Sequence, residues 1–185
     1  MNLDAVRAAL PPHASDLSLN LGSVLTVQGA PGLTERQIWS VALATGIAAR
    51  NATFARRIEG LARAHLDDAH VAAARAAAAI MGMNNIYYRF LHLVEDPEYR
   101  TLPARLRMNV IGRPGIDRLD FELLSLAVSA VNGCGACIVS HERKLREHGV
   151  AREAIQSAVR IAATVHAVAG VLEYEEAGEV PAAAA

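Results

Sequence analysis

The chain has 185 residues, of which 52% are hydrophobic, and this is enough to bury the core of a single domain spanning residues 1–185. Lys and Arg (18) nearly balance Asp and Glu (19), which excludes a polybasic nucleic-acid-binding surface and an acidic disordered tail. The first ten residues lack the pattern of a secretory signal, and no uncharged apolar run is long enough to span a membrane. We therefore expect a cytoplasmic protein that binds neither nucleic acid nor membrane.

The composition favours helices over strands. Alanine accounts for 37 residues and aromatic residues for only 4% of the chain, and this combination is typical of closely packed helices. Pro11-Pro12 separates two short segments. We expect a short helix over residues 1–10 and a further segment, residues 16–25, that packs across the domain.

The next part of the chain predicts three longer helices. Thr34 and Gln37 form a Thr-x-x-Gln capping box directly after Leu33, so a helix should run from there to about Arg50. Two further helices are expected over residues 51–66 and 67–88.

Proline and glycine then mark an irregular connector between residues 96 and 115. Helices are expected over residues 119–131, 134–148 and 151–174. Asn132-Gly133 interrupts the first two of these, and Gly149 stands where a left-handed helix C-cap would lie. We expect the tail, residues 178–185, to fray.

Two parts of the chain resemble each other. Residues 145–163 align with residues 61–79 at an offset of 84, and residues 122–129 lie near residues 37–44 at an offset of 85. Such self-similarity predicts an all-helical fold built from a duplicated unit. Chance similarity between alanine-rich helices is the alternative.

The predicted halves are residues 34–88 and 119–174. At an offset of 85, the positions that match Cys134, Cys137 and His141 are near Ala49, Ala52 and Arg56. The first half is therefore expected to be scaffold, and the second to carry the chemistry.

The only two cysteines, Cys134 and Cys137, are three residues apart. A disulfide closing so small a loop adds little stability. Zinc would need two more ligands, and the Cys-x2-Cys-x3-His-x6-His spacing formed with His141 and His148 does not match the common zinc patterns. The pair could also be helix-packing thiols, but we favour a redox-active dithiol.

Cys134, Cys137 and His141 are spaced at i, i+3 and i+7. On a helix they lie within about 60° of one another and share a face. Cys134 falls at the first turn, where free backbone N–H groups favour a thiolate. His141 can accept a thiol proton.

The preceding helix carries Glu122, Ser125 and Ser129 along one stripe. For the two serines we expect a solvent-facing position. If the Asn132-Gly133 break folds this helix back beside the next, Glu122 can approach His141. A carboxylate that orients an imidazole, which in turn activates a thiol, is a general arrangement for nucleophilic catalysis.

These residues form a Glu-x11-Cys-x2-Cys-x3-His pattern, and the stretch around them resembles the alkyl hydroperoxide reductase D (AhpD) family of the carboxymuconolactone decarboxylase-like superfamily. Residues 80–85, 106–109 and 114–116 also resemble segments of that family. The resemblance therefore spans nearly the whole chain.

The resemblance implies an all-helical, internally duplicated fold and a homotrimer. It also implies an antioxidant, thiol-dependent peroxidase that reduces organic hydroperoxides, oxidised AhpC-type peroxiredoxin, or both. Electrons would come from dihydrolipoamide on a lipoyl-bearing acyltransferase, recharged by dihydrolipoamide dehydrogenase. No cofactor or metal ion would be bound in this chain.

The resemblance further implies roles for four residues. Cys137 would be activated through His141 and Glu122 and would attack the peroxide. Cys134 would be the resolving and more exposed cysteine, which meets lipoamide or the peroxiredoxin. Ala136 departs from the family pattern, which has His there; this leaves the relay intact but bears on the rate and the partner.

Two other functions are weighed against this one. A decarboxylase-type enzyme on the same fold predicts activity that survives loss of both cysteines. A non-enzymatic zinc or interaction module predicts bound metal and no peroxide turnover.

Overall fold

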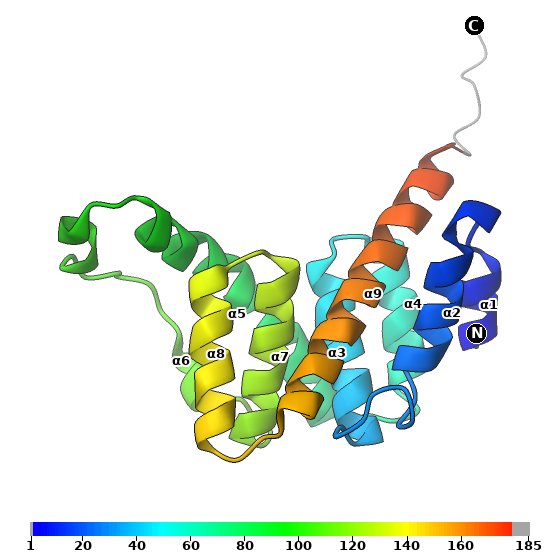
Figure 1. Ribbon diagram of the computed structural model, residues 1–185, viewed down its shortest axis with the longest axis horizontal. Helices are drawn as coiled ribbons and strands as arrows, with labels where there is room; N and C mark the ends of the chain where they lie inside the picture. Colours follow the sequence, from blue (N-terminus) through cyan, green and yellow to red (C-terminus); the bar gives the residue numbers. More distant parts are fainter. Residues whose placement is uncertain (1, 179–185) are drawn as a thin grey trace, which may run out of the picture.

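The computed structural model describes residues 2–178, which contain helices and no strand (Figure 1). The prediction of an all-helical fold is confirmed. Besides two short 3-10 turns, η1 (Pro12–Ala14) and η2 (Pro97–Arg100), the helices are α1 (Leu3–Ala8), α2 (Ser15–Val24), α3 (Glu35–Ala48), α4 (Ala52–Ala62), α5 (Asp68–Leu93), α6 (Asn109–Gly112), α7 (Arg118–Val131), α8 (Gly135–Glu147) and α9 (Arg152–Gly178). The predicted fraying beyond Gly178 lies outside the described residues.

Side-chain caps fix where the longer helices begin. Thr34 and Gln37 form the predicted capping box at the start of α3. Asn51 and Asp67 accept hydrogen bonds from the first-turn N–H groups of α4 and α5. These residues satisfy backbone donors that a helix start leaves unpaired, which is why the predicted starts were close.

The structure differs from the predicted helices in three places, and the first is α4, which ends at Ala62 instead of residue 66. Helix α5 continues to Leu93 instead of ending at Tyr88, because the next helix-breaking residue is Pro97. The short helix α6 was not expected, since its four residues are too few for a periodic pattern.

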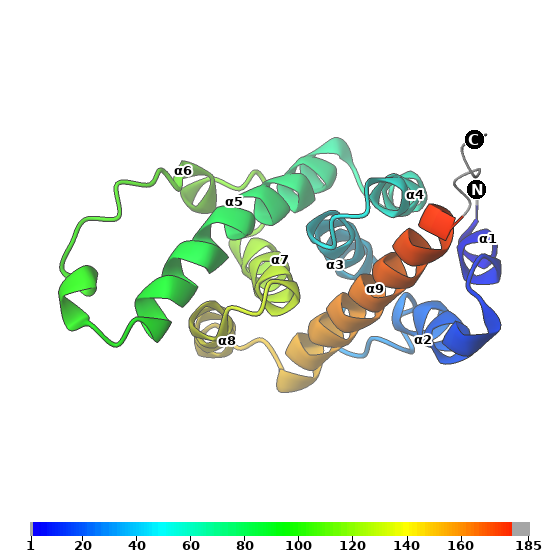
Figure 2. The same cartoon turned by 90° about the horizontal axis from the view of Figure 1, so that it is seen from above.

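Helices α3 and α7 lie at the centre of the molecule. Each has nine consecutive buried residues, from Ile38 to Gly46 in α3 and from Phe121 to Ser129 in α7. Both pack against the long helices α5 and α9 and against each other (Figure 2). Helix α8 covers α7 and the middle of α5, so the cysteine-bearing segment rests on a rigid core.

The chain contains two similar runs of three helices. Helices α3, α4 and α5 have 14, 11 and 26 residues, and α7, α8 and α9 have 14, 13 and 27. The packing is also reciprocal, because α3 packs on α9 as α7 packs on α5. A common origin of the two halves stays a prediction.

The helix caps correct the register between these halves. The N-caps Thr34 and Asp117 correspond at an offset of 83, as do Asn51 and Cys134. The caps therefore give an offset two residues shorter than the predicted 85, since a slip of one or two residues costs little similarity between alanine-rich helices. In the corrected register, Glu122, Cys134, Cys137 and His141 match Trp39, Asn51, Phe54 and Ile58.

The first half therefore fills the equivalent place with core packing. Phe54 and Ile58 have no exposed surface, and Trp39 is buried. None of these apolar side chains can transfer a proton or act as a redox group.

Helix α9 contains one stretch, within Arg152–Ala177, that is long and apolar enough to cross a membrane by composition alone. Within the structure 56% of that stretch is buried against other helices. Packing in the core thus accounts for its apolar character.

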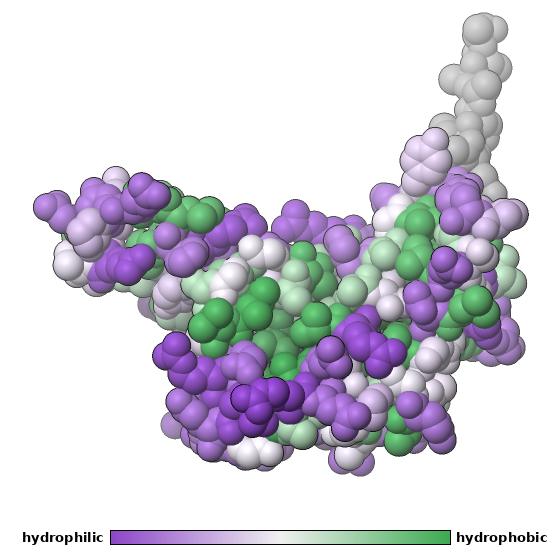
Figure 3. Space-filling model, viewed as in Figure 1, coloured by the Kyte–Doolittle hydropathy of each residue, from purple (hydrophilic) through white to green (hydrophobic). Residues whose placement is uncertain are grey.

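The turn η2 and the loops on either side of it, residues 94–108, project with the end of α5 from the helical body (Figure 1). We call residues 94–108 the arm. Phe90 at the end of α5 packs edge-to-face against Tyr99 of the arm. Apolar side chains are visible on this projecting part of the surface (Figure 3).

Candidate active site

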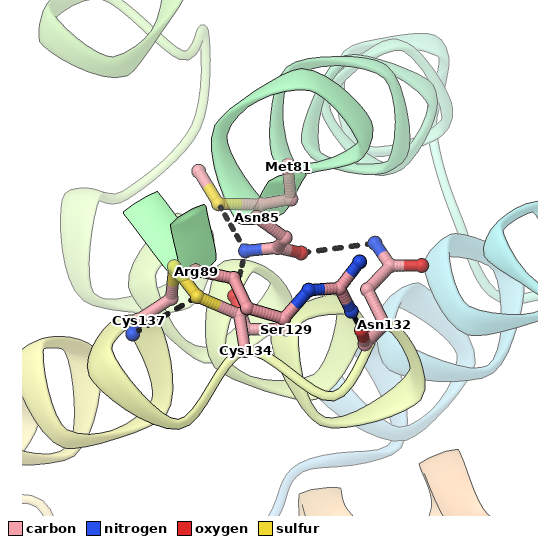
Figure 4. Close-up of a disulfide and its surroundings, with 7 residues drawn as sticks. All are labelled: Met81, Asn85, Arg89, Ser129, Asn132, Cys134 and Cys137. Carbon is pink, nitrogen blue, oxygen red and sulfur yellow. Dashed lines mark hydrogen bonds between the residues drawn. A yellow bond between two sulfur atoms is a disulfide. The ribbon is translucent and has the colours of Figure 1, made fainter. Parts of the chain in front are cut away.

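The two cysteines lie at the N-terminus of α8 and are joined by a disulfide (Figure 4). Cys134 is the N-cap residue, and Cys137 is in the first turn. The Cys137 backbone N–H donates a hydrogen bond to Cys134 Sγ over 3.3 Å. The predicted position of Cys134 at the start of a helix is therefore confirmed.

The two cysteines differ in solvent exposure. Cys134 has no exposed surface, whereas Cys137 is 6% exposed and lines a cavity. The expectation that Cys134 is the more exposed cysteine was wrong. Its cap position turns the side chain back over the helix end, where α5 and α7 cover it.

The cavity beside Cys137 has a volume of about 260 Å³. It lies between the middle of α5, the start of α8 and the residues around α6. His141 and Ser140 contribute polar groups from α8, and Asn84 contributes a carboxamide from α5. Apolar side chains form the remaining wall: Met81, Tyr88, Met108, Ile111 and Ala136.

Glu122 and His141 meet across the α7–α8 hairpin. The turn at Asn132-Gly133 reverses the chain, with Gly133 at a φ of +67°. As a result, Glu122 Oε2 lies 2.7 Å from His141 Nδ1. The predicted approach of this carboxylate to the imidazole is found in the structure.

Lys144 is a further member of the site that the sequence analysis missed. Its ammonium group donates to the other carboxylate oxygen of Glu122. Cys137, His141 and Lys144 occupy positions i, i+4 and i+7 of α8, so they share one face. Extending the stripe by one turn past His141 would have found it.

Glu122 is almost fully buried, with only 4% of its surface exposed. Burial raises the pKa of this carboxyl, but the hydrogen bonds and charges of His141 and Lys144 outweigh burial and hold its pKa below the ordinary value. Glu122 is thus a carboxylate at neutral pH. It can orient the imidazole and stabilise its protonated form.

A buried polar network lies behind Cys134 (Figure 4). Asn85 Nδ2 donates to Ser129 Oγ over 2.9 Å, and Asn132 Nδ2 donates to Asn85 Oδ1 over 2.9 Å. Arg89 donates to the backbone carbonyl of Asn132 over 2.8 Å. The network ties the turn before Cys134 to α5.

The burial of the α7 serines differs from the prediction. Ser125 and Ser129 were expected to face solvent, but both are buried, because their side of α7 packs toward α5 and α8. Asn85 of α5 joins the two halves through its hydrogen bond to Ser129 of α7.

The zinc interpretation finds no support in the geometry. Among residues 2–178, no group of three or more His, Cys, Asp or Glu side chains is placed to hold a metal ion. His148 lies at the other end of α8, where its ring contacts the carbonyl of Lys144 at 2.8 Å. It interacts with the C-terminal end of the helix.

Comparison with known proteins places this site in a family. The family model described as "Carboxymuconolactone decarboxylase family" matches residues 97–178, which include all four predicted site residues. A protein of Rhodospirillum centenum named "Alkyl hydroperoxide reductase AhpD" is 55% identical over 177 residues, covering 96% of this chain and 94% of the relative. The chain belongs to the AhpD family.

Other relatives also support membership of the AhpD family. Proteins with the same name from Streptomyces avermitilis and Gluconacetobacter diazotrophicus are 53% and 52% identical and cover 95% and 99% of this chain. The chain in turn covers 97% and 99% of those AhpD proteins. As a member of the AhpD family, the protein is an oxidoreductase of the peroxidase type.

Proposed function

We propose that this protein reduces alkyl hydroperoxides with the dithiol of Cys134 and Cys137. The observation that carries the proposal is the placement of a disulfide-bonded cysteine pair at a helix N-terminus, with Cys137 in a cavity that His141 also lines. The relatives' printed name, alkyl hydroperoxide reductase, supports the choice of substrate.

The first step is the oxidation of Cys137. His141, oriented by Glu122, accepts the proton of the Cys137 thiol. The resulting thiolate attacks the terminal oxygen of the hydroperoxide, the O–O bond breaks, and the sulfur becomes a sulfenic acid. The protonated His141 returns its proton to the departing alkoxide.

The second step closes the disulfide. Cys134 attacks the sulfenic sulfur and displaces water. A dithiol then restores both thiols by exchange. We assign the attack of that dithiol to the Cys137 sulfur, which faces the cavity, with Cys134 as the leaving group. The hydrogen bond that the Cys137 backbone N–H donates to Cys134 Sγ stabilises such a leaving thiolate.

We further propose that the electron donor is dihydrolipoamide on a lipoyl-bearing acyltransferase, recharged by dihydrolipoamide dehydrogenase, and that an AhpC-type peroxiredoxin is a second oxidised substrate. The apolar wall of the cavity, with Met108 and Ile111, suits the aliphatic chain of a lipoyl group. A cytoplasmic location is proposed because reducing compartments keep such dithiols reduced.

We propose a homotrimer as the functional assembly. Ile86, Phe90 and Leu93 are 57%, 45% and 66% exposed and lie at i, i+4 and i+7 on one face of α5. Tyr99 and Leu102 extend this apolar surface along the arm. Light scattering after size-exclusion chromatography should give three times the 19.6 kDa chain mass, and a monomer would contradict the assignment.

The function is tested by coupled turnover. Cumene hydroperoxide reduction is followed through NADH consumption, with lipoamide and lipoamide dehydrogenase supplied. We expect turnover with the wild-type protein and none with a Cys134→Ser/Cys137→Ser double variant. The absence of wild-type turnover, together with bound zinc on elemental analysis, would contradict the proposal in favour of a metal-binding module.

A further inference from the structure

Asn84 stands apart from the other polar residues around the cysteines. It is only 4% exposed, and its Oδ1 has no hydrogen-bond partner within residues 2–178. Its neighbour Asn85 has both ends of the carboxamide paired, with Ser129 and Asn132. A buried acceptor without a donor costs stability and needs an explanation.

The position of Asn84 explains why its acceptor is left unpaired. Buried side-chain atoms without a partner occur in the described residues also at Ser40 and Arg146, but neither residue lines the cavity beside Cys137. Asn84 does line it, together with Cys137 and His141. The Asn84 side chain is thus part of the wall of the chamber where the proposed substrate would react, and its unpaired Oδ1 is buried in that wall.

A hydroperoxide can supply the hydrogen-bond donor that Asn84 Oδ1 lacks. Its terminal oxygen carries an O–H donor, and that oxygen is the atom that the thiolate attacks. The last torsion of an Asn side chain is soft and roughly two-fold. The Asn84 carboxamide can therefore turn Oδ1 toward a bound ligand at small cost.

We propose that Asn84 is a substrate-binding residue, and that its Oδ1 accepts a hydrogen bond from the terminal O–H of the hydroperoxide. The inference rests on the proposed function. The bond fixes the terminal oxygen and so directs the O–O bond for displacement by Cys137. The S–O bond forms as the O–O bond breaks, the sulfur gives up two electrons, and the alkoxide that leaves takes its proton from His141.

The proposal separates the two halves of the catalytic cycle. The dithiol that re-reduces the disulfide attacks a sulfur atom and offers no peroxide O–H to Asn84. Asn84 therefore matters when peroxide oxidises the protein and not when a dithiol reduces it. A purely structural residue would affect both half-reactions and the stability of the fold.

The test compares three reactions of Asn84→Leu, which has nearly the same volume and no hydrogen-bonding group. They are single-turnover oxidation by cumene hydroperoxide, alkylation of the reduced protein by iodoacetamide, and reduction of the disulfide by dihydrolipoamide. We expect peroxide oxidation to slow by about 10²-fold through lost positioning, with the other two rates within about twofold of wild type. The thermal midpoint should stay the same or rise, because an unpaired buried polar group is removed.

Asn84→Ala gives the same test without a larger apolar side chain, should leucine disturb the packing. Met83→Leu is the matched control, since Met83 is next to Asn84 on α5 and does not line the cavity. Oxidation of both Asn84 variants at the wild-type rate overturns the proposal, and so does an equal loss in all three reactions with a lowered thermal midpoint. If the wild-type protein itself is not oxidised by hydroperoxide, the proposed function fails, which is a distinct result.

Discussion

Replacing Glu122 by Gln tests how the site activates its thiol. The substitution keeps the shape of the side chain and an acceptor for His141, but removes the negative charge. A hydrogen bond with a charged partner is worth about 1.5–3 kcal/mol and a neutral one about 1 kcal/mol. The loss in stabilising the protonated imidazole is thus about 0.5–2 kcal/mol, or about 2- to 30-fold in rate.

Lys144 adds little to this figure. Its side chain is 48% exposed, so water replaces the carboxylate when Glu122 is neutralised, and ion pairs at such exposure contribute little. The contact of Glu122 with His141 carries the effect, since the imidazole side chain is only 14% exposed.

The effect should depend on pH. At pH 7 the thiol needs a base, so cumene hydroperoxide should oxidise Glu122→Gln about 2- to 30-fold more slowly than the wild type. Well above the ordinary thiol pKa of about 8.5 the thiolate forms without help, and the two rates should converge. The assay is rapid-quench oxidation of the pre-reduced protein, with remaining thiols trapped by alkylation.

Glu142→Gln is the matched control, because Glu142 is next to His141 on α8 but points about 100° away from it. Its rate should equal that of the wild type. The reasoning is refuted if Glu122→Gln is oxidised as fast as the wild type at pH 7. It is also refuted if its deficit stays the same at alkaline pH.

Three further predictions follow from the same geometry. In Cys134→Ser, hydroperoxide should still oxidise Cys137 to a sulfenic acid, which should form a mixed disulfide with a monothiol such as 2-mercaptoethanol and release water. In Cys137→Ser the buried Cys134 should do both slowly, and the reverse order by mass spectrometry would contradict the assignment. Because the pKa of Glu122 is lowered on folding, this residue should stabilise the fold fully above about pH 4.5 and lose this contribution as the pH falls. The difference in urea midpoint between wild type and Glu122→Gln should therefore shrink in acid, and a constant difference would refute this prediction. Gly133→Ala should lower the free energy of unfolding by about 1–2 kcal/mol, since the φ of Gly133 is +67°. Gly135→Ala, inside α8 with open space around it, should not destabilise the protein. Equal losses of stability in the two variants would contradict this prediction.

The sequence was sufficient for features set by local chemistry. The capping box at Thr34, the C-cap at Gly149 and the break at Asn132-Gly133 each follow from which backbone groups a few neighbouring side chains can satisfy. The meeting of Glu122 with His141 was also predictable, because that break places them at matching distances along an antiparallel hairpin.

The remaining features depend on contacts between distant segments. The burial of Ser129 and the order of exposure of the two cysteines depend on how α5 covers the α7–α8 turn, which periodicity does not reveal. The register of the two halves was visible only once the caps were placed. The unpaired carboxamide of Asn84 likewise appears only when the cavity is known.

We propose that the cavity around Cys137 makes this thiol unusually reactive toward hydroperoxides. The most direct measurement is the second-order rate constant for oxidation of the reduced protein by cumene hydroperoxide at pH 7, beside that of free cysteine. We expect the protein to react at least about 10²-fold faster, losing two thiols per hydroperoxide and forming the disulfide between Cys134 and Cys137. A rate equal to that of free cysteine, or oxidation without that disulfide, would contradict the account.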